Sequence, residues 1–226
     1  MSDYVSFPRP GGTTAGYLAR PARAGPAVVV IQEWWGLVPH VERVADRLAA
    51  EGFVALAPDL YHGQTTSSPD EAGRLMMSLQ VDATARDLDG AIAYLKDQPE
   101  VKGSKVGTVG FCMGGALSLF AASRNRDVGA CVVFYGAHPN VKPDLAALQA
   151  PVLGLYGGRD SSVTPQVVAD LDRRLAALGK RHEFHTYPDA SHAFFNDTRP
   201  GVYDPVASAD AWAKTLAFLR RELKAS

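Results

Sequence analysis

A cysteine between glycines, at the junction of a strand-like and a helix-like segment, constrains the fold more than any other feature of the chain. Residues 110–115 read Gly-Phe-Cys-Met-Gly-Gly. The run 105–109 before them favours a strand, and the Ala- and Leu-rich run 116–122 after them favours a helix. Such a sharp turn crowds its neighbours and strains its central residue, so small flanking residues are required. The pattern therefore predicts a strand–turn–helix unit that presents the Cys112 thiol.

Apolar runs without polar alternation recur along the chain, each bounded by Gly or Pro. They cover residues 27–31, 53–56, 106–109, 130–134 and 152–156. Unbroken apolar strands are typical of parallel sheets that are covered on both faces. Segments with helical period lie between or after them, at residues 41–48, 88–95, 168–178 and 212–223. This alternation predicts an α/β fold, with a mostly parallel central sheet and helices on both faces.

Length and composition are those of a globular protein that acts on small molecules. The 226 residues contain no repeat or low-complexity linker, so a single domain over residues 1–226 is expected. With 46% hydrophobic and 21% charged residues, the chain can bury a large core. A formal net charge of −1 with scattered Lys and Arg argues against a nucleic-acid partner and against a membrane-binding patch.

The lack of signal-peptide features in residues 1–5 and the small number of cysteines predict a cytoplasmic protein. Residues 1–5 lack the charged region and apolar stretch of a signal peptide, and the longest aliphatic run, 27–31, is too short to span a bilayer. Two cysteines do not make a disulfide framework in a chain of this length, so both are expected to be reduced. Cys131 lies inside an apolar run and is assigned to the core.

The spacing around Cys112 matches the G-x-S-x-G nucleophile elbow of α/β hydrolases, with a thiol in place of the serine hydroxyl. The following helix aims its N-terminal N–H groups at the thiol and favours its thiolate form. A nucleophile needs a base, and the base needs an orienting carboxylate. In this fold the acid precedes the histidine along the chain. Asp160 follows the run 152–156 and His192 follows the strand-like run 182–187, so Cys112, Asp160 and His192 form the predicted triad.

Each of these residues also has a simpler interpretation. Cys112 is otherwise a small buried residue before a helix, and Asp160 is otherwise an ordinary turn aspartate. His182 and His185 project to opposite faces of their strand, which argues against a shared metal ion. The polar segment 61–70 either roofs a ligand site or is a plain surface loop.

An oxyanion hole in this fold uses the N–H after the nucleophile and a second N–H from the loop after an early strand. Met113 supplies the first. The segment Gln32-Glu33-Trp34-Trp35 leaves the first apolar run, and the Trp34 N–H is the candidate for the second. Trp35 is expected to be a packing residue.

Five short motifs occur in order along nearly the whole chain: Gln32-Glu33, Pro58-Asp59-Leu60-Tyr61, the elbow at 110–115, Gly157-Gly158-Arg159-Asp160 and Ser191-His192. With them the chain resembles the dienelactone hydrolase (carboxymethylenebutenolidase) family. The resemblance implies the same triad, no cofactor or metal, and a role in aromatic compound degradation. It also implies that Glu33 lies near the resting thiol, where substrate binding displaces its carboxylate so that it takes the thiol proton. A structural salt bridge from Glu33 to an arginine is the alternative.

The sequence predicts the substrate less directly than it predicts the triad. A thiolate usually leaves more easily than an alkoxide, so enol lactones and activated esters suit a thiol nucleophile better than amides or alkyl esters. Family members bind the carboxylate of dienelactone through two side chains. One is an Arg in the segment between the Pro-Asp-Leu-Tyr motif and the next helix, and the other is a Ser directly after the catalytic histidine. Here Arg74 is the only arginine in the first segment and Ala193 follows His192. Arg74, Tyr135 and Ala193 are the candidate substrate-binding residues, and an uncharged substrate is left open.

Other functions compatible with these residues are a thioesterase or carboxylesterase of different acyl specificity, and a non-catalytic domain that uses the thiol for redox sensing or binding. The expected partner is a small ester or lactone, and the expected assembly is a monomer or a small homo-oligomer.

Overall fold

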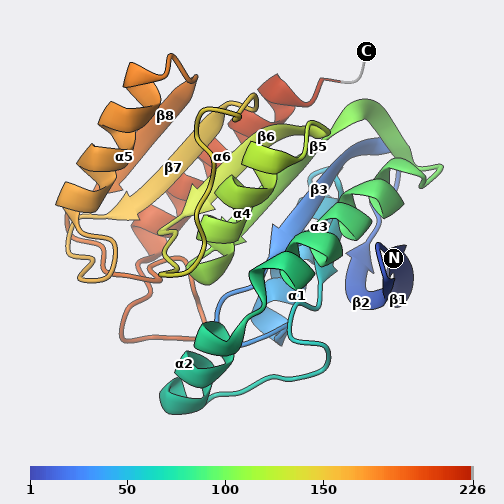
Figure 1. Cartoon of the computed structure of the whole chain (residues 1–226), viewed down its shortest axis with the longest axis horizontal. Helices are drawn as coiled ribbons and strands as arrows, with labels where there is room; N and C mark the ends of the chain where they lie inside the picture. The colour runs from blue at the N-terminus through green and yellow to red at the C-terminus, as the bar shows by residue number, and fades with distance from the viewer. Residues whose placement is uncertain (225–226) are drawn as a thin grey trace.

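The computed structural model describes residues 1–224 and contains one eight-stranded sheet with helices on both faces (Figure 1). The strands run in the spatial order β1-β2-β4-β3-β5-β6-β7-β8. Their bounds are β1 (Ser2–Arg9), β2 (Gly12–Ala19), β3 (Gly25–Ile31), β4 (Val54–Pro58), β5 (Val101–Phe111), β6 (Val128–Phe134), β7 (Val152–Gly157) and β8 (His182–Tyr187). All pairings from β4 to β8 are parallel. The predicted α/β-hydrolase fold with a mostly parallel sheet is confirmed.

An antiparallel hairpin, β1–β2, forms one edge of the sheet and was not predicted. Its two strands join at Pro10 and Gly11, and β2 pairs antiparallel with β4. Gly11 has φ +84°, a left-handed conformation that glycine adopts without steric cost. Most β1 side chains are exposed, and Phe7 is its single buried residue. A strand with so little buried surface lacks the continuous apolar signal that marks β3 to β7.

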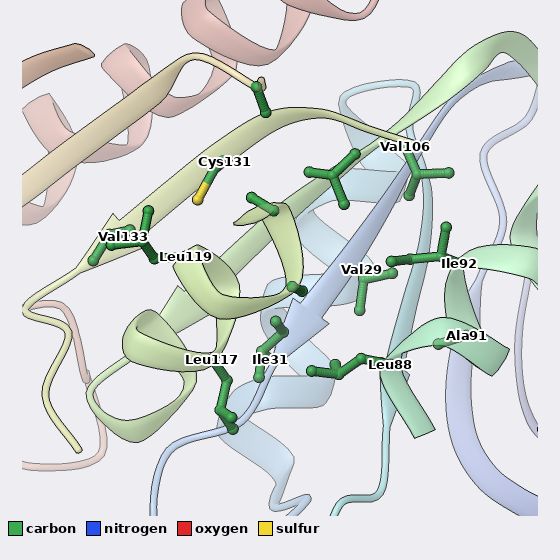
Figure 2. Packing of buried hydrophobic residues seen from close by; sticks show 14 of the residues in the cluster. Val29, Ile31, Leu88, Ala91, Ile92, Val106, Leu117, Leu119, Cys131 and Val133 are labelled. Carbon is green, nitrogen blue, oxygen red and sulfur yellow. The ribbon is translucent and has the colours of Figure 1, made fainter. Parts of the chain in front are cut away.

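Within residues 1–224, six helices flank the sheet. They are α1 (Pro39–Ala50), α2 (Pro69–Ser78), α3 (Val81–Lys96), α4 (Met113–Arg124), α5 (Pro165–Ala177) and α6 (Pro205–Glu222). Buried residues of α3, α4 and α5 share one cluster on one face of the sheet, called here the α4-side core, part of which is drawn in Figure 2. Buried residues of α1 and α6 share a second cluster, the α6-side core. The sheet therefore separates two apolar cores.

Helix α2 was also not predicted, because it begins inside the polar segment 61–70. Ser68 caps it by accepting a hydrogen bond from the Glu71 N–H, and Pro69 occupies the first turn. Only Ala72 is buried along the helix. A helix with one buried residue has no apolar stripe from which it can be recognised.

The carboxyl ends of the parallel strands meet at one edge of the sheet. Glu33 follows β3, Cys112 follows β5, Asp160 follows β7 and His192 follows β8. Four residues that are far apart in sequence are thus brought to the same edge. Within residues 1–224, no helix has both the length and the apolar character needed to cross a membrane.

Candidate active site

Cys112 occupies a strained turn between β5 and α4. Its φ is +53°, and its carbonyl accepts hydrogen bonds from the N–H groups of Gly115 (2.9 Å) and Ala137 (3.1 Å). A Cβ on Gly114 would collide with the backbone of Ile31 and Gln32 at the end of β3. The glycine thus permits the close approach of the helix start to the neighbouring strand. The strand–turn–helix unit has the form that the sequence predicts, and the Cys112 side chain is half-buried.

Backbone strain is concentrated at this edge of the sheet. Four residues other than glycine have positive φ in the part of the chain that the structure describes. Three of them, Cys112 (+53°), Tyr135 (+39°) and Ala193 (+61°), follow β5, β6 and β8, and the fourth is His62. Such conformations cost about 1–3 kcal/mol each and gather at functional sites. Their distribution makes the carboxyl edge of the sheet the candidate functional site.

The half-buried His192 and the buried Asp160 form a hydrogen-bonded pair. His192 Nδ1 lies 2.7 Å from Asp160 Oδ2. The other carboxylate oxygen accepts the N–H groups of Ser162 (2.7 Å) and Val163 (2.8 Å). Burial raises the pKa of Asp160, but these hydrogen bonds outweigh that effect and lower its pKa overall. The carboxylate is therefore fixed and ionised, and it orients the imidazole.

The electrostatic environment of His192 favours the imidazolium. Burial lowers the pKa of His192, but the hydrogen bond to Asp160 and the interaction with the Cys112 sulfur raise it to about 10. These interactions favour the protonated ring, and the contribution of Cys112 requires its thiolate form. An imidazolium can give a proton to a leaving group, but it cannot take one from a thiol.

Glu33 is held by two neutral donors. Its carboxylate is buried, with Asn196 Nδ2 at 2.6 Å from Oε2 and the Tyr135 hydroxyl at 3.4 Å from Oε1. Asn196 is fixed in turn, because its Oδ1 accepts the N–H (3.0 Å) and the hydroxyl (2.6 Å) of Thr198. Among residues 1–224, no Lys or Arg pairs with Glu33. The alternative interpretation, a structural salt bridge from Glu33 to an arginine, is therefore not found.

Tyr135 lies behind the site. Its side chain is fully buried, does not line the cavity, and packs edge-to-face on the His192 ring with centroids 5.1 Å apart. Burial, followed by the negative charge of Glu33, raises the pKa of Tyr135 well above its usual value. The hydroxyl therefore stays protonated and donates to Glu33. The structure places Tyr135 as a support for Glu33 and His192, where the sequence suggested a substrate contact.

A cavity of about 830 Å³ opens over Cys112. Glu33, Trp34, His192 and Ala193 line it together with the thiol, so the structure gathers these predicted residues. Asp160 is buried behind His192.

Arg74 does not reach the cavity. Its side chain is exposed on α2 and pairs with Glu71. No residue of the polar segment 61–70 lines the cavity, although Thr66 N–H bonds the Trp35 carbonyl at 3.1 Å. The candidate cation Arg74 is therefore not at the cavity, and of the two alternatives for segment 61–70 the surface loop fits this lining better.

Three other arginines line the cavity: Arg159, Arg174 and Arg199. Arg159 pairs with Asp189, and Arg174 lies 3.9 Å from Asp170. Arg199 is half-buried, and its guanidinium lies 5.5 Å from the centre of the Trp35 ring. Within residues 1–224 it forms no ion pair. Arg199 is thus the cation at this site that is free to meet an anion.

Sequence reasoning missed Asn196 and Arg199. Both lie in the segment that connects β8 to α6, four and seven residues after His192. A usable signal was present, because loops at the carboxyl ends of strands commonly carry binding residues. The family resemblance, however, points to the segment around Arg74 and not to this one.

Two backbone N–H groups are available beside the thiol. Met113 is the first residue of α4, and the first N–H groups of a helix have no intrahelical acceptor. In the part of the chain that the structure describes, the Trp34 N–H has no acceptor either. Trp34 packs edge-to-face on Trp35 at 5.0 Å, and both indoles line the cavity. Trp35 thus combines the predicted packing role with a place in the cavity wall.

His138, His62 and Cys131 lie in other environments. His138 lines the cavity and contacts the Met76 carbonyl at 3.0 Å, whereas His62 lies 3.3 Å from the Asp87 carboxylate. Cys131 is fully buried, and burial raises its pKa to about 11, so it does not form a thiolate near neutral pH. Residues 1–224 contain no cluster of three His, Cys, Asp or Glu side chains placed to hold a metal ion.

Comparison with known proteins identifies the family of the chain. The model of the Dienelactone hydrolase family matches residues 14–223. "Protein usf" of Aquifex pyrophilus is 36% identical, covering 99% of this chain and all of that protein. A "Putative carboxymethylenebutenolidase" of Aquifex aeolicus is 34% identical, with the same coverage of both chains. A Klebsiella pneumoniae structure titled as a "Putative Dienelactone Hydrolase" superimposes with a TM-score of 0.89 at 30% identity, covering 98% of each chain. The chain therefore belongs to the dienelactone hydrolase family, a family of hydrolases that act on ester and lactone bonds.

Proposed function

We propose that the protein is a cysteine hydrolase that opens enol lactones of the dienelactone type or cleaves activated esters. Cys112 is the nucleophile, His192 the acid and base, and Asp160 the residue that orients His192. The observation that carries the proposal is a half-buried thiol on a strained turn, in one cavity with an imidazole that a buried carboxylate holds at 2.7 Å.

Glu33 is the group that takes the thiol proton. In this proposal Glu33 and not His192 is the base, because the hydrogen bond to Asp160 raises the pKa of the His192 imidazole and favours its protonated form. Two carboxylates line the cavity, Glu33 and Asp170, and Asp170 is exposed on α5. Substrate binding moves the Glu33 carboxylate from Asn196 toward the thiol, which then forms its thiolate only when substrate is present. This order protects the sulfur from oxidation, because susceptibility follows thiolate character.

The thiolate then attacks the carbonyl carbon, and the N–H groups of Met113 and Trp34 stabilise the oxyanion. Collapse breaks the carbon–oxygen bond of the ester, and His192 gives its proton to the departing oxygen. Neutral His192 next removes a proton from water, which attacks the acyl group on Cys112. The thiolate that leaves recovers its proton from Glu33, so every proton is accounted for.

Leaving-group chemistry supports enol lactones and activated esters. The tetrahedral intermediate expels the better leaving group, and a thiolate outcompetes an ordinary alkoxide. A stabilised enolate or phenolate competes well with the thiolate, so these substrates go forward to the acyl-enzyme. Arg199 lies at the cavity wall without a carboxylate partner, and it is the group that meets a substrate carboxylate.

Steady-state turnover of p-nitrophenyl acetate and cis-dienelactone tests the proposal. Cys112→Ala is expected to abolish both activities, and Cys131→Ala, the matched control, to retain them. Unchanged rates in Cys112→Ala would refute the cysteine mechanism. If iodoacetamide labels Cys112 in the native protein without changing any hydrolase activity, a thiol switch without catalysis becomes the better description.

A further inference from the structure

We propose that the site takes esters with an extended apolar acyl group, and that this group lies in an arm of the cavity between α4 and α5. The inference rests on the proposed function, because it assigns one end of the cavity to the acyl half of an ester bound at Cys112.

The first wall of this arm is a face of α4. Cys112, Ala116 and Leu119 follow one another at spacings of four and three residues, so they share one side of the helix. All three line the cavity, as does Gly115, which adds no side chain. A rise of 1.5 Å per residue places Leu119 about 10 Å along the helix from the thiol. Beside it the wall continues with Val133 of β6, which Figure 2 labels in the same part of the core.

The second wall is a face of α5. Val167, Asp170, Leu171 and Arg174 line the cavity at the spacing of one helical face. Val167 and Leu171 offer apolar surface, and Val167 is 52% exposed although it is a large aliphatic residue. An apolar side chain on an open cavity wall is available to cover an apolar ligand.

The segment after β6 closes the arm from a third side. Ala137, Val141 and Pro143 line the cavity there. The segment is tied to α2 by the contact of His138 Nε2 with the Met76 carbonyl at 3.0 Å. Apolar side chains from three elements thus surround a path that begins at the nucleophile.

The two ends of the cavity lie against different cores. This difference assigns the leaving group of the ester to one end and the acyl group to the other. His192 protonates the leaving group, and its neighbours Ala193 and Val202 pack in the α6-side core. Leu119, Val141 and Leu171 pack in the α4-side core on the other face of the sheet. The leaving group therefore lies at the His192 end, and the acyl group extends along α4 and α5.

Chain-length profiles test the inference. For p-nitrophenyl esters from acetate through butyrate to octanoate, kcat/KM is expected to rise about tenfold or more. One methylene buried in an apolar pocket already changes kcat/KM by about tenfold or more. Alkyl thioacetates, in which the leaving group lengthens instead, are expected to give a flat profile. A flat acyl profile, or a rise only with the leaving group, would overturn the assignment.

Two variants block the arm at partly exposed positions. Leu171→Trp and Val167→Trp are expected to remove the gain with octanoate and to leave acetate turnover within about twofold. Leu178→Trp is the matched control, because Leu178 is exposed at the end of α5 and does not line the cavity. Unchanged octanoate turnover in both blocking variants would refute the arm.

The outcome also separates this inference from the proposed function. A wild-type protein that turns over acetate but shows no preference for long acyl groups refutes only the apolar arm. A wild-type protein that turns over no ester at all refutes the proposed function, and the inference falls with it.

Discussion

Asn196 Nδ2 lies 2.6 Å from Glu33 Oε2, and the two side chains are buried together at 1% and 2% exposure. A buried carboxylate is costly unless donors compensate for its lost hydration. Here one amide and one phenol do so, and among residues 1–224 no Lys or Arg pairs with the carboxylate to fix its charge permanently. In the proposed mechanism Glu33 exchanges partners when substrate enters, and neutral donors hinder this exchange less than a tight ion pair would.

Removing the amide donor is expected to destabilise the protein. Asn196→Ala leaves one oxygen of Glu33 buried without its partner, at a cost of about 2 kcal/mol in the free energy of unfolding. Urea unfolding at pH 7 measures this change. Asn140→Ala is the control, because Asn140 is exposed and contacts His138 only through its backbone N–H. Equal stabilities of the two variants would show that Asn196 does not hold Glu33.

Replacing the proposed base is expected to slow turnover without loss of the fold. Glu33→Gln keeps an oxygen that can accept from the Tyr135 hydroxyl, but it cannot take the thiol proton. A fall in kcat/KM for p-nitrophenyl acetate of roughly a hundredfold or more is expected. Glu71→Gln is the control, because Glu71 lies on α2 and does not line the cavity. Activity of Glu33→Gln within twofold of wild type would exclude the carboxylate as the base.

Stability is expected to fall as the pH rises from about 6.5 to about 10. The folded state holds a proton on His192 up to its raised pKa of about 10, whereas the unfolded chain loses it near 6.5. In this window the folded state binds more protons than the unfolded state, so the contribution is complete below pH 6.5 and disappears as pH passes 10.

The size of this contribution is on the order of 2 kcal/mol when the partial exposure of the ring is allowed for. Denaturant unfolding at several pH values measures it, and His192→Gln is expected to flatten the profile between pH 6.5 and 10. The same slope in wild type and variant would mean that His192 is not the group responsible.

Arg199 is expected to select substrates that carry a carboxylate. Arg199→Ala should lower kcat/KM for cis-dienelactone by roughly tenfold to a hundredfold, the range for losing a hydrogen bond to a charged group. Turnover of uncharged p-nitrophenyl acetate should change little. Arg74→Ala is the matched control, because Arg74 lies on α2 outside the cavity. A larger loss in Arg74→Ala than in Arg199→Ala would reverse the assignment.

Much of the fold was predictable because its signals are local. The strands β3 to β7 are buried on both faces and read as unbroken apolar runs, and the elbow at Cys112 is marked by glycines that have no room for a side chain. The hairpin β1–β2 and helix α2 expose most of their side chains, so neither carries a strong apolar pattern.

The supporting residues of the site depend on tertiary contacts. Asn196 meets Glu33 across 163 positions, only because the segment after His192 folds back over the end of β3. Tyr135 and Arg199 likewise take their roles from neighbours that are distant in sequence. No spacing rule links such pairs, so the sequence predicted the order of the reacting groups but not the residues that hold them.

Trapping of the acyl-enzyme tests the central claim most directly. The protein is mixed with p-nitrophenyl acetate, quenched in acid within the first turnover, digested, and mapped by peptide mass. The account predicts one acetyl group on the peptide that contains Cys112, none on the peptide that contains Cys131, and no adduct in Cys112→Ala. Steady turnover without an acetyl group on Cys112, or with the group on another residue, would contradict the claim that Cys112 is the nucleophile.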